Sequence, residues 1–577
     1  MSQTIQTMEL LTVITVPVII TLQQLLVGYY SEVPVFFKLE WITLALCMLY
    51  IWICASSISI EDSNLKENEE SNNENPNRSK TMEKSIPKSD PAMGCSSKLS
   101  TCMTINLNDL QWRKSRDQGY WCTLLLPFVM ITDGLYDKSV LNTLHISFIN
   151  NILMYKILSH LKVETLSLKS IGLFTLIQQQ GFLFGLDTME TLLVFIIFVV
   201  FQYSCVKLPQ LLPLSFTSGE NEVITQSAAI YLISVVYKLS KFDPTTYTIP
   251  RKLDEDQEIF FFTNLAVIGG AIVAVTSYLL GKWMKKFTLA FYPLLFTLIA
   301  IVTILLGYMM QQNPLMWLLR YLTDETHRQL LFLYWAVCSA VSAIIATVCY
   351  NFAKNKGSTI IRKYFHILAI IVFTPGILVD SKMLSVATSC VLVVVIVLEC
   401  IRIIRVWPFG DAIHNAFQVF VDEKDGGIVI LTHIYLLIGC AVPLWLSQKL
   451  QSEPPIALFS GIISIGIGDT TASIFGTKFG KTKWPNSKKS VEGTVAAIVL
   501  QGIFVIILLH SGWISFGNTT QILGDTLMPL LPNGALWIYR YLVVTIAIIS
   551  TSLLEAFTSQ IDNLVLPIFM YTILRCI

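Results

Sequence analysis

Long apolar stretches alternate with short polar ones along most of the chain. A helix needs about 20 mostly apolar residues to cross the hydrocarbon core of a bilayer. The pattern therefore predicts an all-α polytopic integral membrane protein with about 15 to 17 transmembrane helices. The predicted spans are 9–29, 37–58, 119–135, 140–160, 168–186, 189–213, 223–240, 259–280, 287–311, 330–350, 364–380, 383–404, 427–447, 456–474, 491–511, 535–555 and 560–576.

One stretch departs from this pattern. Residues 61–118 are rich in Asn, Ser, Glu and Lys. Such a segment buries too little apolar surface to offset the entropy of folding, so we expect a disordered and dispensable loop. We accordingly divide the chain into N-terminal spans (1–60), this loop, a multi-span membrane region (119–350) and a C-terminal membrane domain (351–577) that carries the candidate chemistry.

The composition agrees with a membrane protein. Of 577 residues, 54% are hydrophobic and 14% are charged, whereas soluble chains carry about 25% charged residues. A net charge of +1 argues against a nucleic-acid partner. None of the 12 cysteines has a CxxC or zinc-ligand spacing, so we interpret them as small buried hydrophobic residues. The N-terminus lacks a basic region before its apolar stretch, which favours a first span over a cleaved signal peptide.

Lysine and arginine clusters orient the C-terminal half of the chain. Single crossings between them keep all of these loops on one side, and the positive-inside rule assigns that side to the cytosol. The segment 511–534 then lies in the lumen, where the sequon Asn518-Thr519-Thr520 gives weak support. The basic clusters lie at 282–286, 354–363, 402–405 and 478–489.

An aspartate follows two glycines at the end of one apolar stretch. Residues 466–473 read Gly-Ile-Gly-Asp-Thr-Thr-Ala-Ser, and a charge at such a position is costly unless it has a function. We predict that Gly466 and Gly468 form a tight turn whose N–H groups bind an anion. Asp469, next to Thr470, would then bind Mg²⁺ or another divalent cation beside phosphates. The alternative is a helix break with a capping aspartate.

A lysine-rich loop follows and ends with Lys-Lys-Ser-Val-Glu-Gly-Thr at 488–494. Lys488 and Lys489 would hold phosphate as point charges. Glu492 and Gly493 would open a helix at the bilayer surface and add a metal or nucleotide contact. Topogenic lysines and ordinary helix-start chemistry are the plainer alternatives.

Two further polar groups lie at the same ends of predicted spans. Arg362, Lys363 and His366 begin one span, and Asp562 and Asn563 lie between two apolar runs. His366 is a candidate base or phosphate donor, with a satisfied interfacial histidine as the alternative. The Asp562–Asn563 pair is harder to explain by packing, so we favour a function for it.

Together these residues supply what phosphoryl transfer requires, namely positioned cations, a divalent metal and an oriented hydroxyl. Asp469 would bind the metal and the lysines the phosphates. Either Asp562 or His366 would orient or deprotonate the acceptor, and the residues do not decide between them. The stretch 411–425, on the same face, predicts an amphipathic helix on the membrane surface.

Several short motifs in sequence order resemble the dolichol kinase family over roughly residues 200 to 577. They are SFTSGE at 215–220, RKYFH at 362–366, DGG at 425–427, IYLLIG at 434–439, GIGDT at 466–470, KKSVEGT at 488–494 and EAFTSQIDN at 555–563. The block from GIGD to the Lys-Glu-Gly segment also resembles the wider group of CTP-dependent polyprenol, phytol and diacylglycerol kinases.

The resemblance implies a multi-pass enzyme of the endoplasmic reticulum membrane whose active site faces the cytosol. Such an enzyme transfers the γ-phosphate of CTP to dolichol, and dolichyl phosphate serves N-glycosylation, O- and C-mannosylation and GPI-anchor synthesis. The loop 466–494 would bind CTP, with Arg362, Lys363 and Asn563 as further candidate contacts. The implied partners are CTP, dolichol and membrane lipids, and a homodimer stays open.

Other functions compete with this one. A CTP-dependent kinase of phytol, another polyprenol or diacylglycerol would use the same site. A polytopic transporter would suit the many spans, but its charged residues belong at the midplane and not at one face. An intramembrane aspartyl protease also uses GxGD, yet the Tyr-Asp pair that it needs occurs only at Tyr136-Asp137, far upstream.

Overall fold

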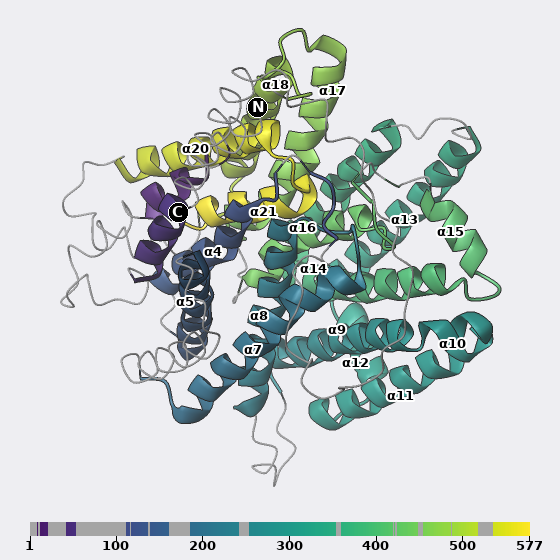
Figure 1. The fold of residues 1–577 in the computed structure, drawn as a ribbon. Helices are drawn as coiled ribbons and strands as arrows, with labels where there is room; N and C mark the ends of the chain where they lie inside the picture. The colour runs from purple at the N-terminus through teal and green to yellow at the C-terminus, as the bar shows by residue number, and fades with distance from the viewer. Residues whose placement is uncertain are drawn as a thin grey trace, which may run out of the picture.

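The computed structural model describes residues 9, 12–20, 42–53, 111–115, 117–136, 139–160, 185–241, 253–352, 359–418, 421, 424–447, 454–485, 487–516 and 535–577. Within these ranges the secondary structure is helical. The β pairing in these ranges is confined to two isolated bridges, Pro455 with Ser515 and Lys483 with Ser490. The predicted all-α class is therefore confirmed (Figure 1).

The helices follow one another along the chain in a single series. They are η3 (Tyr120–Leu124), α4 (Leu125–Tyr136), α5 (Val140–His160), α7 (Thr188–Leu211), α8 (Ser218–Ser240), α9 (Glu255–Leu279), α10 (Gly281–Lys286), η5 (Thr288–Ala290), α11 (Phe291–Met310), α12 (Pro314–Thr323), α13 (Thr326–Phe352), α14 (Thr359–Ile404), α15 (Gly410–Gln418), α16 (Thr432–Leu446), η6 (Ile456–Phe459), η7 (Ile462–Asp469), α17 (Thr470–Phe479), α18 (Val491–His510), α20 (Ala535–Phe557) and α21 (Asp562–Leu574).

Among the described residues, nine helices are long and apolar enough to cross a membrane. The polytopic prediction is thus confirmed, although the predicted spans do not all become separate full-length crossings. The spans predicted at 427–447 and 560–576 are helices of 15 and 13 residues, shorter than the roughly 20 residues of a full crossing. The span predicted at 168–186 lies almost entirely outside the described residues.

Two predicted spans, 364–380 and 383–404, form the two halves of α14. The helix is interrupted at Asp380, whose backbone has φ −155° and ψ 93°. The Asp380 carboxylate accepts the backbone N–H of Met383 at 2.8 Å. Asp380 therefore caps the second half of α14, as an aspartate does at an ordinary helix start.

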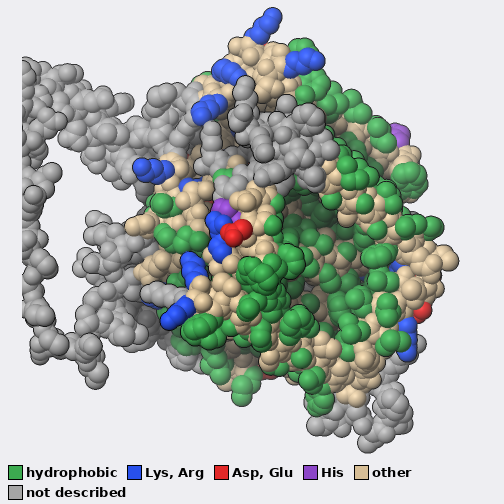
Figure 2. Space-filling view, turned by 90° about the vertical axis from the view of Figure 1, so that its right-hand side faces the viewer, with side chains coloured by type: hydrophobic (Ala, Val, Ile, Leu, Met, Phe, Trp, Pro, Cys, Tyr) green, Lys and Arg blue, Asp and Glu red, His purple; other side chains and the backbone are tan. Residues whose placement is uncertain are grey.

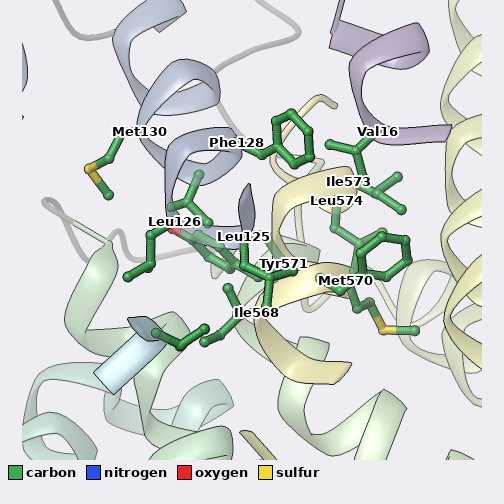
Figure 3. Close-up of a cluster of buried hydrophobic side chains, with 14 of the residues drawn as sticks. Val16, Leu125, Leu126, Phe128, Met130, Ile568, Met570, Tyr571, Ile573 and Leu574 are labelled. Carbon is green, nitrogen blue, oxygen red and sulfur yellow. The ribbon is translucent and has the colours of Figure 1, made fainter. Parts of the chain in front are cut away.

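Helix α21 packs against α4, α16 and α20 (Figure 1). Nearly all of its side chains are buried. Its residues Ile568, Met570 and Tyr571 pack with Phe128 of α4 and with Val16 in one hydrophobic cluster (Figure 3). This packing fixes α21 and with it the first residue of the helix, Asp562.

Three elements cross at backbone contact beside the start of α21. A Cβ atom at Gly439 of α16 would lie 2.0 Å from the carbonyl oxygen of Asn563. A Cβ atom at Gly461, just before η7, would lie 2.6 Å from the carbonyl oxygen of Gly439. Glycine is required at both positions because any larger residue would force the elements apart, as at small-residue helix crossings in membranes.

The helices around α9 to α13 have a different surface. Ile304 of α11 is 73% exposed and Leu330 of α13 is 67% exposed. Figure 2 shows hydrophobic side chains over a large part of one face of the molecule. Helices that present apolar side chains outward are typical of contact with lipid.

The amphipathic helix predicted within 411–425 is present in part. Helix α15 covers Gly410–Gln418, and Lys424 lies in a turn beyond it.

The disordered loop predicted for 61–118 extends too far. Residues 61–110 and 116 lie outside the described residues, but residues 111–115 and 117–118 pack against the start of α8. The N–H of Arg113 donates to the carbonyl of Phe216 at 2.8 Å, and the N–H of Gly219 donates to that of Gln118 at 2.8 Å. The polar composition misled the prediction because the partners of these polar groups come from α8, far along the chain.

Candidate active site

Asp469 ends the π-helix η7, and α17 follows without a break. The predicted glycine turn is therefore wrong, and neither Gly466 nor Gly468 has a positive φ. The two glycines instead admit close neighbours. A Cβ at Gly466 would lie 2.6 Å from Cγ1 of Ile370, and one at Gly468 would lie 2.7 Å from Nε2 of Gln501. π-Helical turns are rare and frequent at functional sites, and this one determines the direction of the Asp469 side chain.

The start of α14 supplies two partners for Asp469. Lys363 Nζ lies 2.5 Å from Oδ2 of Asp469 and 3.3 Å from its carbonyl oxygen. His366 Nε2 lies 3.2 Å from the same Oδ2. Residues three apart share a helix face, which explains why both reach one carboxylate. Both Asp469 and His366 are buried.

A second group of charges meets this one from α20 and α21. Lys489 donates to the carboxylate and to the carbonyl of Glu555, and its Nζ lies 3.6 Å from Oδ2 of Asp562. Lys424 Nζ lies 3.6 Å from Oδ1 of Asp562 and donates to the carbonyl of Gln560 at 2.7 Å.

The lysine loop is held against the end of α20 by its own side chains. Ser487 Oγ donates to the carbonyl of Ala556 at 2.8 Å. The ring of Trp484 packs edge-on against Phe557, with the centroids 5.2 Å apart. These contacts bring Lys489 beside Glu555.

Asp469, Glu555 and Asp562 form a cluster of carboxylates. One oxygen from each lies within 4.8 Å of the others, the only such group of three potential ligands in the described part of the chain. Oδ1 of Asp562 is buried and has no hydrogen-bond partner. Converging carboxylates repel one another unless cations offset their charge, and oxygen ligands of this kind suit Mg²⁺. The residues therefore fit a divalent cation.

Lys363, Lys424 and Lys489 are the cations around this cluster. Burial lowers the pKa of Lys489, but Asp562, Glu555 and Asp469 outweigh burial and raise that pKa above its ordinary value. Lys489 therefore carries its positive charge over the whole range in which proteins are stable. A positive charge fixed beside three carboxylates is available to a phosphate oxygen.

Five predicted residues thus meet in one place: Lys363, His366, Asp469, Lys489 and Asp562. Two others lie next to them. Thr470 is buried and its Oγ1 has no hydrogen-bond partner, and Asn563 donates to the carbonyl of Thr432 at 3.5 Å.

Other predicted residues lie apart from the cluster. Lys488 is exposed, and the Glu492 carboxylate accepts the backbone N–H of Thr482 in the lysine loop at 2.9 Å. Gly493 allows α18 to approach α17, because a Cβ there would lie 2.6 Å from the carbonyl of Ala472. The side chain of Arg362 lies outside the described residues.

Sequence reasoning missed two members of the cluster, Glu555 and Lys424. Glu555 begins the EAFTSQIDN motif at the end of an apolar stretch, so the cost of an intramembrane charge was a sufficient signal for it. Lys424 lies in the polar stretch after α15, where nothing in the sequence distinguishes it from neighbouring surface charges.

The fold and this cluster place the chain among polytopic helical membrane proteins that carry a charged site at the ends of their spans. The sequence profile described as dolichol kinase matches residues 182–501. The dolichol kinase of Mus musculus is 33% identical over 412 residues, which cover 68% of this chain and 71% of that protein. The chain belongs to the dolichol kinase family.

Other relatives carry the same name. The dolichol kinase of Homo sapiens is 32% identical over 410 residues, 68% of this chain and 70% of that protein. Dolichol kinase EVAN of Arabidopsis thaliana is 31% identical over 296 residues, 50% of this chain and 48% of that protein. No solved structure matches the chain.

Proposed function

We propose that this protein phosphorylates dolichol in the endoplasmic reticulum membrane, with CTP as the phosphate donor and the active site facing the cytosol. One observation carries the proposal. Three carboxylates converge within 4.8 Å at the ends of apolar helices, and lysines from three separate segments surround them. A site of this composition accommodates a divalent cation and a polyphosphate.

Asp469 and Glu555 would hold the cation, together with one of the two carboxylate oxygens of Asp562, which leaves its other oxygen for the acceptor. When bound, Mg²⁺ neutralises charge on the donor phosphates. Without a nucleotide, each of Lys363, Lys424 and Lys489 pairs with a carboxylate. Donor phosphates give these lysines a second set of partners, so the same side chains bind and orient the polyphosphate.

The acceptor hydroxyl must lose a proton as its oxygen bonds to the γ-phosphorus. The bond from that phosphorus to the bridging oxygen breaks, and CDP leaves. We assign the proton to the Asp562 carboxylate, which is 18% exposed and has a buried oxygen without a hydrogen-bond partner. His366 is buried against Asp469, so we assign it the orientation of that carboxylate. A general base typically contributes about 10²–10⁴-fold.

The exposed lysines of the loop between α17 and α18, Lys481, Lys483 and Lys488, support a cytosolic orientation by the positive-inside rule. CTP is a soluble nucleotide and is accessible on that side. Figure 2 shows basic, acidic and histidine side chains gathered beside hydrophobic surface. Such a border suits a reaction between a charged donor and an alcohol with an isoprenoid tail.

The test is phosphate transfer by the purified protein in liposomes. γ-Labelled CTP or ATP is offered with dolichol, phytol or diacylglycerol, and wild type is compared with Asp562→Asn and with Lys478→Ala. Lys478 is an exposed lysine on α17. We expect label on dolichol from CTP, a loss of about 10²-fold or more in Asp562→Asn, and full transfer in Lys478→Ala.

If only phytol or diacylglycerol is labelled, the proposed site stands and the assignment of dolichol as acceptor is wrong. If only ATP gives label, the assignment of CTP as donor is wrong. Absence of label from every pair, with the protein folded, would overturn the kinase and favour a transporter.

A further inference from the structure

The described residues 111–115 and 117–118, here called the 111–118 segment, reach the candidate active site through a buried arginine. Arg113 is 6% exposed. Its guanidinium forms an ion pair with Glu220, and its Nη1 donates to the carbonyl oxygen of Lys424 at 3.3 Å. One planar side chain therefore connects α8 with the turn that carries a lysine of the carboxylate cluster.

Glu220 also contacts a second segment of the site. Its Oε1, which accepts from Arg113, also accepts the backbone N–H of Ile561 at 2.8 Å. Ile561 directly precedes Asp562. Glu220 is itself fixed, because it forms a capping box with Thr217 at the start of α8.

The neighbouring residue of the turn is held in the same way. Gln560 is fully buried and accepts a hydrogen bond from Thr217 Oγ1 at 2.5 Å. Its Nε2 donates to the carbonyl oxygen of Asp117 at 2.9 Å. The turn between α20 and α21 is thus bonded on one side to the start of α8 and on the other to the 111–118 segment.

We propose that Arg113 is a positioning residue for phosphoryl transfer, which fixes Lys424 and Asp562 relative to one another through its forked contacts with Glu220 and the Lys424 carbonyl. The inference rests on the proposed function of the cluster. Arg113 itself lies outside residues 182–501, which the family profile matches. A segment whose composition resembles a dispensable loop thereby becomes part of the site.

The geometry favours arginine over any other cation. A guanidinium donates in two directions within one plane, whereas a lysine ammonium is a point charge on a flexible stem. Partners that orient the side chains of a site, without touching the ligand, typically contribute about 10–100-fold to affinity or activity.

The test separates positioning from simple stabilisation by comparing Arg113→Ala with two controls. Lys114→Ala removes an exposed charge from the same segment. Arg575→Ala breaks a partly buried ion pair, with Asp133 at 2.7 Å, at the far end of α21. Hydrogen exchange of the 558–562 backbone and kcat for dolichol phosphorylation are measured on the full-length protein, together with the unfolding temperature.

We expect faster exchange at 558–562 and a fall in kcat of about 10–100-fold in Arg113→Ala, with an unchanged KM for dolichol. Arg575→Ala should lower the unfolding temperature without either effect, and Lys114→Ala should match wild type. Arg113→Lys should recover kcat only in part.

A double variant, Arg113→Met with Glu220→Gln, removes both charges and leaves no unpaired buried carboxylate. Its unfolding temperature should return toward that of wild type while kcat stays low. Recovery of kcat in this variant, or wild-type exchange at 558–562 in Arg113→Ala, would overturn the positioning role. If wild type transfers no phosphate, the proposed function fails, and the exchange data still decide whether Arg113 orders the turn.

Discussion

The first half of α14 connects two charged clusters of opposite construction. At its start, Lys363 and His366 meet Asp469, beside two further carboxylates within 4.8 Å. At its end, Asp380 pairs with Arg328 at 2.7 Å, and Arg328 pairs in turn with Glu255 at 2.5 Å. In the second cluster the Arg328 guanidinium lies between the two carboxylates, whereas in the first cluster three carboxylates converge.

The arrangement of the carboxylates distinguishes a ligand site from a structural network in this membrane protein. The Asp380 cluster links α9, α13 and α14 through alternating charges, which is typical of a structural brace. In the Asp469 cluster three lysines pair with the carboxylates, yet one oxygen from each carboxylate converges within 4.8 Å, and Oδ1 of Asp562 has no hydrogen-bond partner. Such a set of oxygens suits a divalent cation.

Removal of divalent cations is the strongest test of the comparison. EDTA should abolish phosphate transfer, and excess Mg²⁺ should restore it, because the donor phosphates would lose the cation that neutralises their charge. Both clusters contain basic side chains that pair with their carboxylates, so the helical circular dichroism should be unchanged. Full transfer in EDTA would contradict the cation site.

The same substitution at the two ends of the half-helix should differ in its effect on kcat. Asp469→Asn should lower kcat by roughly 10²-fold or more, the loss typical of removing one electrostatic contact in a site, and it should also cost stability because Lys363 loses its charged partner. Asp380→Asn should lower the free energy of unfolding by about 1–3 kcal/mol, since Arg328 loses its charged partner, and leave kcat nearly intact. Equal kcat values for the two variants would remove the distinction.

Two adjacent lysines of the site differ in their contacts. Lys489 contacts Glu555 and Asp562, whereas Lys488 is exposed. Lys489→Ala should reduce transfer by about 10–100-fold, within the range for electrostatic groups in a site, and Lys488→Ala by much less. The ratio is measured from initial rates at saturating CTP. A larger loss for Lys488→Ala would indicate that Lys488, and not Lys489, contacts the phosphates.

The smallest expected effect concerns packing. Gly439→Ala should destabilise the protein by about 1–3 kcal/mol, as overpacking does, because its Cβ would lie 2.0 Å from the carbonyl of Asn563. A Cβ atom added at Gly502 of α18 would meet no atom within 4 Å. Gly502→Ala should therefore leave the stability of the protein unchanged or raise it by up to about 1 kcal/mol. Thermal unfolding in detergent compares the two variants.

Much of the fold followed from hydropathy, since apolar stretches of bilayer length must be helical. Polar side chains are costly at the ends of such stretches, and this cost identified His366, Asp469 and Asp562 as candidate site residues. The sequence did not reveal where the helix ends meet. Lys424 and Glu555 join the cluster only because the turn that carries Lys424 and the lysine loop meet the end of α20 and the start of α21, through contacts between residues far apart in the chain.

Two local predictions failed for identifiable reasons. Gly466 and Gly468 resembled a turn, because glycine is the usual residue of turns, but in the folded chain the missing side chains admit Ile370 and Gln501. Residues 111–118 resembled a solvated loop by composition. Composition does not show that Arg113 and Asp117 find their partners at the start of α8 and in the turn before α21.

The backbone crossing of Gly439, Gly461 and Asn563 has a mechanical consequence. Main-chain atoms have no rotamers, so α16, α21 and the segment before η7 cannot slide past one another without first separating. The spacing of Asp469 and Asp562, at the ends of two of these elements, is therefore stiff. A change in bilayer thickness should be absorbed by tilting of the peripheral helices α11 and α13, and turnover should vary little between membranes of different thickness.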